Sequence, residues 1–501
     1  MTSGSLAGSR YLFWPPFLAG TLLRAWGMTR QPLWVDEILT LRAASIGDPF
    51  RWSDVFANPQ GPLPHVLLRS WVAMFGAGDP ALRAWSVLAG VAALAVGLLV
   101  FRRFWPSAAP LAGWFLALSP FQIWYAQEVR NYVFVLGAAF LVLATFRSLI
   151  EKPSARNAAL HAAAVAGLLL CNLSGLLLIP ALGLLAATSG RRRTAAAWTA
   201  ATAVAVAAAF PWVWSELFGH VEWSGVTGIE SGAQPIRGGR TFVPVLLPYT
   251  FVVLLGGTGL GPSPRLLHAG LSPDWTILAP GLIVGFLGVL LAAAGLRGRF
   301  REPRVRILLV WCTVPVLLAA LVAAVGLKAY NARYVAFVQP AFLLLAAGGV
   351  AALARERRLL GRLGGVFLIA AMIQGYVRQT YDPEYGKEDF RAAAGYLEER
   401  ARPGDLILQQ GVHGPLHRYY AGEVPIETYY PVYFGEADGG EERLRTLIAG
   451  RERVWWVGSR LWYEDPDRRV LRWLAGRGEF VVSWDAPGVA VRAYAVDGEG
   501  E

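Results

Sequence analysis

Two adjacent carboxylates, Asp36 and Glu37, stand shortly after the first apolar segment of the chain. Carboxylates can take up a proton from a hydroxyl group or support a bound cation. The first 379 residues are otherwise poor in acids, and a carboxylate pair at the edge of a membrane costs solvation free energy unless it has a partner or a task. We therefore interpret this pair as the reaction centre.

Two further polar clusters stand at the ends of apolar segments. Glu128, Arg130 and Tyr132 form one cluster, and Arg333 and Tyr334 belong to the other. An arginine guanidinium offers planar, bidentate hydrogen bonds to phosphate oxygens, so either cluster can hold an anionic group. The alternative is that arginine and tyrosine only anchor helix ends at the membrane interface, and each cluster alone favours that alternative. Together with the carboxylate pair, the clusters favour function.

The composition indicates which class of protein must position these residues. The 501-residue chain is 55% hydrophobic and 16% charged, which excludes an ordinary water-soluble globule and predicts a polytopic membrane protein. Residues 1–379 carry 31 Lys/Arg against 13 Asp/Glu, whereas residues 380–501 carry 15 against 22. This shift predicts an all-α membrane domain over 1–379 and a soluble α/β domain over 380–501.

Eleven apolar segments predict transmembrane helices, since a helix rises about 1.5 Å per residue through a hydrocarbon core about 30 Å thick. A helix over 62–76 contains His65 and is predicted to lie in the interface. The carboxylate pair lies in a predicted outer loop over 29–61, and a long outer loop is predicted over 215–273. The eleven predicted spans are 11–28, 82–101, 108–124, 131–148, 157–171, 173–189, 194–214, 275–296, 307–326, 335–353 and 362–378.

The basic residues between these spans predict the orientation, because cytoplasmic loops hold an excess of Lys and Arg close to the membrane. All five basic connections fall on one side of an eleven-span count, together with the amino terminus, which we therefore place in the cytoplasm. The carboxylate pair, Glu128, Arg333 and the soluble domain are then extracytoplasmic. The five connections contain Arg102 and Arg103; Arg147, Lys152 and Arg156; Arg191, Arg192 and Arg193; Arg297, Arg299, Arg301, Arg304 and Arg306; and Arg355, Arg357, Arg358 and Arg362.

The soluble domain is predicted to contain a helix over 388–402 and strands over 406–409, 454–458, 480–484 and 489–494. Asp465-Pro466-Asp467 spells a DxD, the metal-binding pattern of nucleotide-sugar transferases. We favour the alternative in which Asp465 caps a helix over 468–475. The sequence has no phosphate-binding glycine loop or dinucleotide fingerprint after a predicted strand, so nothing in it indicates a soluble nucleotide as energy source. We also expect no nucleic-acid partner.

Several of these stretches, in the same order, resemble one family. They are 32–37, Pro62-Leu63, 82–90, 119–132 with its Gln-Glu-x-Arg-x-Tyr cluster, and Ala332-Arg333-Tyr334. They are similar to the polytopic GT-C glycosyltransferases related to protein O-mannosyltransferases and the lipid A aminoarabinose transferase. The resemblance covers residues 1 to about 350. Many relatives carry a His before Pro-Pro-Leu, where this chain has Gln60-Gly61-Pro62-Leu63, so a His-assisted metal site is put in doubt and a divalent cation stays an open possibility.

The resemblance implies a hexosyl- or pentosyltransferase that uses a polyprenyl-phosphate sugar donor at the extracytoplasmic face of the cell membrane. The acceptor would be a hydroxyl group of a lipid, glycan or protein. Asp36 would act as the base, and Glu37 would take a supporting, metal-binding or acceptor-binding role. Arg130 and Arg333 would hold the donor phosphate, with Glu128 orienting Arg130 or the sugar and Tyr132 and Tyr334 beside them.

Two rival classes are a lipid or solute transporter and a non-catalytic assembly subunit. A transporter would also be polytopic and could use charges at membrane depth. The sequence shows no internal repeat or paired broken spans, and its polar clusters gather at one predicted membrane face. The transferase is therefore the favoured prediction.

Overall fold

The computed structural model describes residues 13–56, 60–219, 244–263, 265–266, 275–325, 330–411, 413–430, 440–461 and 465–496. The chain divides into two compact units. The membrane unit comprises Met1–Met28, Thr40–Gly261 and Asp274–Gln379. The C-terminal unit comprises Thr380–Glu501 together with two earlier segments, Thr29–Leu39 and Pro262–Pro273. The stretch that holds the carboxylate pair thus belongs to the C-terminal unit.

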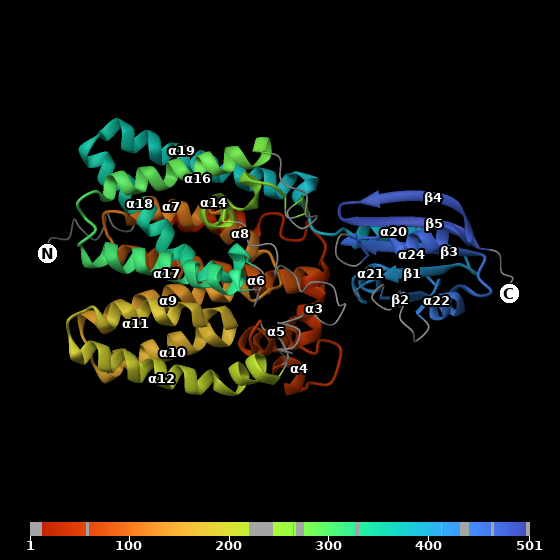
Figure 1. Cartoon of the computed structure of the whole chain (residues 1–501), viewed down its shortest axis with the longest axis horizontal. Helices are drawn as coiled ribbons and strands as arrows, with labels where there is room; N and C mark the ends of the chain where they lie inside the picture. Colours follow the sequence, from red (N-terminus) through yellow and green to blue (C-terminus); the bar gives the residue numbers. More distant parts are fainter. Residues whose placement is uncertain are drawn as a thin grey trace. The chain divides into compact units, whose positions relative to one another are not determined.

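Long apolar helices build the membrane unit, and they run side by side in Figure 1. Six segments of the described chain are long and apolar enough to cross a membrane, and each overlaps one predicted span. The chain is therefore a multi-pass membrane protein. The six segments are Asp79–Phe104 (α6), Tyr132–Glu151 (α9), Arg192–Leu217 (α12 and the turn after it), Pro303–Ala324 (α17), Ala332–Glu356 (η4 and α18) and Arg358–Tyr381 (α19).

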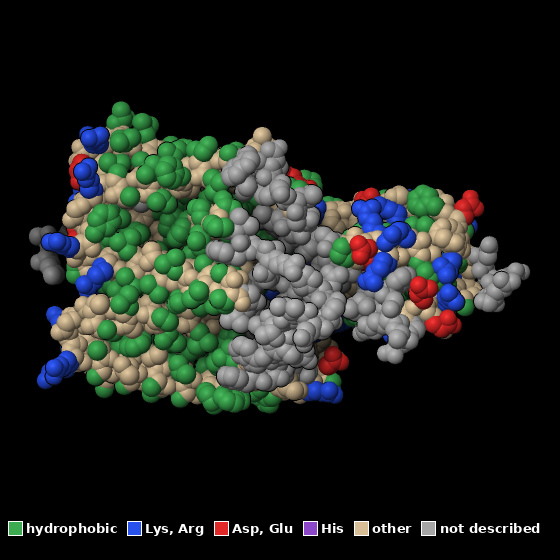
Figure 2. Space-filling model, viewed as in Figure 1, with side chains coloured by type: hydrophobic (Ala, Val, Ile, Leu, Met, Phe, Trp, Pro, Cys, Tyr) green, Lys and Arg blue, Asp and Glu red, His purple; other side chains and the backbone are tan. Residues whose placement is uncertain are grey.

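Further helices, most of them shorter, complete the membrane unit, so the count of eleven spans stays a prediction. They are α2 (Trp14–Ala25), α5 (Pro62–Phe75), α7 (Ala109–Leu118), α8 (Pro120–Ala126), α10 (Ala155–Cys171), η1 (Leu173–Leu178), α11 (Ile179–Ala187), α14 (Leu246–Gly256), η3 (Thr258–Leu260) and α16 (Trp275–Leu296). Hydrophobic side chains cover the visible sides of this bundle, and Lys and Arg gather at one end of it (Figure 2).

The predicted span over 108–124 is two helices in the structure, α7 and α8. The break is at Ser119, because the residue before a proline is disfavoured in helical geometry and Pro120 has no backbone N–H. Ser119 adopts an extended conformation (φ −60°, ψ 114°), and its hydroxyl accepts a hydrogen bond from the backbone N–H of Gln122 at 3.3 Å. The proline thus begins a new helix that leads directly into the Glu128 cluster.

The prediction of one loop over 215–273 is wrong for residues 246–256, which form α14. The sequence Leu-Leu-Pro-Tyr-Thr-Phe-Val-Val-Leu-Leu-Gly is apolar throughout, and Leu254 and Leu255 are buried. Eleven residues are too few to predict a membrane crossing, which is why the segment was assigned to a loop. Residues 220–243, 264 and 267–273 of the predicted loop lie outside the described residues.

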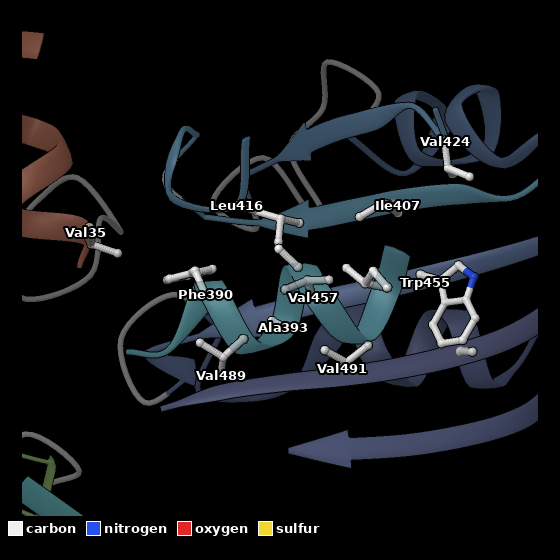
Figure 3. Packing of buried hydrophobic residues seen from close by; sticks show 13 residues of the cluster. Val35, Phe390, Ala393, Ile407, Leu416, Val424, Trp455, Val457, Val489 and Val491 are labelled. Carbon is white, nitrogen blue, oxygen red and sulfur yellow. The ribbon is translucent and has the colours of Figure 1, made fainter. Parts of the chain in front are cut away.

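The C-terminal unit contains a five-stranded mixed sheet in the order β2-β1-β3-β5-β4 (Figure 1). Strand β1 pairs in parallel with β2 and β3, while β5 pairs antiparallel with β3 and β4. Its helices pack around two apolar clusters, one of which includes Val35, Phe390 and Val457 (Figure 3). The elements are β1 (Leu406–Gln410), β2 (Ile426–Tyr429), β3 (Arg453–Ser459), β4 (Gly478–Ala486), β5 (Val489–Val496), η5 (Pro383–Tyr385), α20 (Phe390–Arg400), α21 (Pro415–Tyr419), α22 (Gly440–Ile448) and α24 (Arg469–Ala475).

The four predicted strands and the first predicted helix of this unit are confirmed within a few residues. Strand β2 was not predicted, since its four residues are too few to show a clear alternation. The prediction of Asp465 as N-cap is wrong in position, since the N-cap is Arg468, but the Asp465 carboxylate does accept hydrogen bonds from the first backbone N–H groups of the helix, those of Arg469 (2.9 Å) and Val470 (3.0 Å). The helix begins one residue later than predicted, at Arg469.

Candidate functional site

The carboxylate pair lies in the first turn of helix α3 (Val35–Ala43). Acidic residues are favourable there because the first backbone N–H groups of a helix carry partial positive charge. Glu37 is the third residue of the helix, and its Oε2 accepts a hydrogen bond from the backbone N–H of Trp34 at 3.3 Å. This contact is one half of a capping box. Glu37 thus has a structural task that the sequence analysis did not assign to it.

Both carboxylates meet cations within the C-terminal unit. The side-chain Nζ of Lys387 lies 3.3 Å from Oε2 of Glu37, and neither side chain is more than 5% exposed. Both Nη1 and Nη2 of Arg460 donate to Oδ1 of Asp36, each at 3.3 Å. The neighbouring carboxylates therefore have separate partners, which keeps two buried negative charges from facing each other without compensation.

Arg460 also binds a second carboxylate, Glu388, through its Nε at 2.6 Å. Burial by itself lowers the pKa of Arg460, but the carboxylates of Glu388 and Asp36 outweigh it and raise that pKa above its ordinary value. The Arg460 guanidinium is therefore a permanent positive charge beside Asp36.

In the membrane unit, Arg130 is held by Thr40 and Gln60. Thr40 lies one turn after Asp36 in α3, and its Oγ1 accepts from Arg130 Nη1 at 3.4 Å. With its amide oxygen toward Arg130, Gln60 accepts from Nη1 at 2.7 Å and from Nη2 at 3.2 Å, while its amide nitrogen donates to Thr40 Oγ1 at 3.2 Å. Gln60, which stands where relatives have a His, thus fixes the direction of the Arg130 guanidinium.

The ring of Tyr132 brings the two predicted phosphate-binding arginines together. The guanidinium carbons of Arg130 and Arg333 each lie 5.9 Å from the centre of this ring. Arg333 also lies 5.5 Å from the ring centre of Tyr334, and Tyr125 packs 4.8 Å from Tyr132. Four residues that the sequence analysis singled out from two distant stretches therefore form one cationic, aromatic cluster.

Glu128 is buried in the same turn, and its backbone carbonyl accepts from the Ser86 hydroxyl at 2.7 Å. The motif residues beside it, Gln127 and Asn131, have structural tasks. The Gln127 amide donates to the backbone carbonyls at the end of α2, among them that of Trp26 at 2.8 Å. The Asn131 amide donates to the carbonyls of Gln60 (2.8 Å) and Cys171 (2.7 Å), which joins the start of α9 to two other segments.

The turn that presents Gln60 depends on Gly61. Its φ of +83° is in the left-handed region, and a Cβ there would lie 2.2 Å from the carbonyl oxygen of Leu170. Helix α5 begins directly after it and buries His65, whose pKa is lowered to about 4. Burial is the main cause, while the nearby backbone of Gly61 raises this pKa and the charge of Arg130 lowers it further. His65 is therefore neutral near pH 7.

The divalent cation that the sequence leaves open would find few donors among the described residues. Across the described ranges, no three His, Cys, Asp or Glu side chains converge to hold a metal ion. The first candidate ligands, Asp36 and Glu37, are each paired with a cation, and His65 lies near the positive charge of Arg130.

The structure adds three residues that the sequence analysis missed: Gln60, Lys387 and Arg460. Gln60 could have been suspected from its place in the family pattern. Lys387 and Arg460 are separated from the carboxylate pair by 350 and 424 residues, and no local signal marks them.

The fold is similar to that of known membrane glycosyltransferases. No protein-family model matches the sequence, and neither does any curated protein. ArnT from Cupriavidus metallidurans in the apo state is 16% identical with a TM-score of 0.59, and the alignment covers 98% of each chain. The structure of the same protein bound to undecaprenyl phosphate aligns over 97% of this chain and 98% of that chain at 16% identity, with a TM-score of 0.53.

A third similar structure is the Archaeoglobus fulgidus oligosaccharyltransferase in complex with zinc and sulfate. It is 13% identical with a TM-score of 0.50, over 97% of this chain and 73% of that chain. Identities this low establish a shared fold and nothing finer. The chain therefore has the GT-C fold, as the motif resemblance predicted.

Proposed function

We propose that this protein is an integral-membrane glycosyltransferase that moves a sugar from a polyprenyl-phosphate donor to a hydroxyl acceptor at the extracytoplasmic face. One observation carries the proposal: Arg130 and Arg333, from distant parts of the chain, meet at the ring of Tyr132 in a protein of GT-C fold. Two guanidinium groups beside the same ring suit a phosphate, because each can form paired hydrogen bonds with its oxygens.

The proposed reaction uses these groups as follows. The carboxylate of Asp36 takes the proton of the acceptor hydroxyl while the acceptor oxygen forms a bond to the anomeric carbon of the sugar. The bond from that carbon to the phosphate oxygen breaks, and the polyprenyl phosphate departs with the electron pair. Arg130 and Arg333 stabilise the departing charge, so the leaving group needs no proton. Glu128 orients Arg130 or the sugar, and Tyr132 and Tyr334 bind beside the phosphate.

The remaining parts of the assignment concern Glu37 and the location. Glu37 is proposed as a supporting residue, in agreement with its contacts to Trp34 and Lys387. The basic end of the helix bundle in Figure 2 supports a cytoplasmic position for that end in the cell membrane.

Substitution of the proposed base tests the function. In reconstituted protein with a polyprenyl-phosphate sugar and a hydroxyl acceptor, Asp36→Asn should lower turnover by about 100-fold or more, the usual contribution of a general base. Thermal unfolding of the variant, measured in parallel, shows whether it is folded. Asp48→Asn is the matched control, because Asp48 is an exposed acid that follows the same helix. Turnover retained by folded Asp36→Asn would rule out Asp36 as the base.

A further inference from the structure

The residue directly after strand β3, Arg460, contacts the proposed base Asp36. Arg460 follows Ser459 directly, and it is a non-glycine residue in the left-handed region, with φ +50°. Such a conformation is disfavoured for a residue with a Cβ, and it persists only where surrounding structure holds it. Here the surrounding contacts are those to Asp36 and Glu388.

Glu388 determines which edge of the guanidinium faces Asp36. Its Oε1 accepts from Nε of Arg460 at 2.6 Å, which leaves the two terminal nitrogens to meet Oδ1 of Asp36 at 3.3 Å. The side chains of all three residues are only 11–12% exposed. The geometry is thus fixed from both sides of the arginine.

The segment that carries Asp36 is built into the C-terminal unit. Val35 belongs to the apolar cluster with Phe390 and Val457 (Figure 3), and the backbone N–H of Leu33 donates to the Tyr419 hydroxyl at 2.6 Å. The ring of Trp34 lies 5.1 Å from the guanidinium carbon of Arg460 and 5.7 Å from Nζ of Lys387. These contacts hold the start of α3 against the two cations.

We propose that Arg460 is a positioning residue for Asp36, so that the C-terminal domain supplies part of the catalytic apparatus; this inference rests on the proposed function. Among the described residues of this unit, Arg460 pairs with Asp36 and Glu388, and Lys387 pairs with the neighbouring Glu37. Loss of Arg460 removes a positive charge that lies 3.3 Å from Oδ1 of Asp36. The ionised form of Asp36 is then disfavoured, and the base becomes protonated at a higher pH.

The test measures the pH dependence of kcat/KM in the full-length reconstituted protein. Arg460→Gln should move the acid limb of the profile upward by about one pH unit, with the KM for the donor unchanged. Arg460→Lys keeps the positive charge, so the acid limb of its profile should lie close to that of the wild type. Arg453→Gln is the matched control, because Arg453 stands at the other end of β3 and binds a different buried acid, Asp405, at 3.3 Å.

Three kinetic results would overturn the inference: an unchanged acid limb in Arg460→Gln, a rise in donor KM without a shift of the limb, or the same shift in Arg453→Gln. A double-mutant cycle of Asp36→Asn and Arg460→Gln in thermal unfolding tests the contact without turnover. Additive melting shifts would show that the pair is absent and overturn the inference. If the wild-type protein transferred no sugar, the proposed function would fail. Coupling between Asp36 and Arg460 in the cycle would then show that the ion pair is purely structural, and this result would also overturn a positioning role.

Discussion

At the scale of single residues, the Gln-Glu-x-Arg-x-Tyr motif before α9 contains two kinds of polar side chain. Gln127 and Asn131 donate to backbone carbonyls and hold segments together. Arg130 instead has a guanidinium that is aimed by Gln60 and Thr40 toward the ring of Tyr132. The motif therefore contains both the residues that hold the local backbone in place and the arginine that this backbone positions.

Arg130→Ala should raise the donor KM by about 10- to 100-fold, because a charge-assisted hydrogen bond contributes about 1.5–3 kcal/mol. Arg130→Lys should recover only part of this loss, since an ammonium cannot form the paired hydrogen bonds of a guanidinium. Steady-state kinetics at varied donor concentration provide the measurement. Arg69→Ala is the control, because Arg69 binds the backbone carbonyls of Ala44 and Asp48 instead. An unchanged donor KM in Arg130→Ala would show that the phosphate assignment is wrong.

His65 should make the protein less stable in mild acid. An unfolded histidine takes up a proton below pH 6.5, whereas folded His65 does so only near its pKa of about 4. Its effect is absent above pH 6.5, and stability falls as the pH drops from 6.5 toward 4, by about 2 kcal/mol at pH 5. The melting temperature of His65→Gln should therefore fall less between pH 7.5 and 5 than that of the wild type. His413→Gln, which changes an exposed histidine, should behave as the wild type does.

At the scale of elements, helix α5 is bounded by two glycines with nearly the same φ, +83° at Gly61 and +81° at Gly76. Only Gly61 is crowded, since a Cβ at Gly76 would meet nothing within 4 Å. Substitution at Gly76 therefore tests the cost of the positive φ alone, whereas substitution at Gly61 tests that cost together with a steric clash.

Gly76→Ala should cost about 1–3 kcal/mol, because a positive φ combined with an extended ψ (φ +81°, ψ 174°) is a backbone conformation that residues with a Cβ rarely adopt. Gly61→Ala should cost more, because its Cβ would clash with backbone atoms of Leu170 and Cys171. It should also raise the donor KM, since the displaced turn carries Gln60 away from Arg130. Melting temperatures and donor KM values of both variants check this. Equal effects of the two substitutions would show that glycine is needed at position 61 only because of its positive φ.

Local chemistry explains which elements the sequence could predict. Hydropathy predicts the six long helices, and Asp465 predicts a helix start close by, although the N-cap itself is Arg468. Helix α14 and strand β2 were missed because each is too short for its periodicity to be distinctive. The meeting of Arg130 with Arg333 could be expected only from the family resemblance. The contacts of Arg460 and Lys387 could not be expected at all, since they depend on tertiary structure that brings residues hundreds of positions apart together.

At the scale of the whole molecule, charge is distributed by segment. The membrane unit gathers Lys and Arg at one end of its helices (Figure 2), while residues 380–501 are net acidic. Translocation across a membrane disfavours short basic loops, and an acidic domain carries no such barrier. The distribution predicts that the basic end stays in the cytoplasm and that the acidic domain is exported.

Cysteine accessibility tests this orientation in intact cells with a membrane-impermeant thiol reagent. The native cysteines, Cys171 and Cys312, are both buried and should give a low background. A cysteine in the C-terminal domain, Glu479→Cys, should be labelled without lysis, because Glu479 is exposed on β4. A cysteine at the exposed start of α12, Arg192→Cys, should be labelled only after the membrane is opened. Labelling in the reverse pattern would place the acidic domain in the cytoplasm, where an extracytoplasmic sugar transfer by Asp36 could not occur.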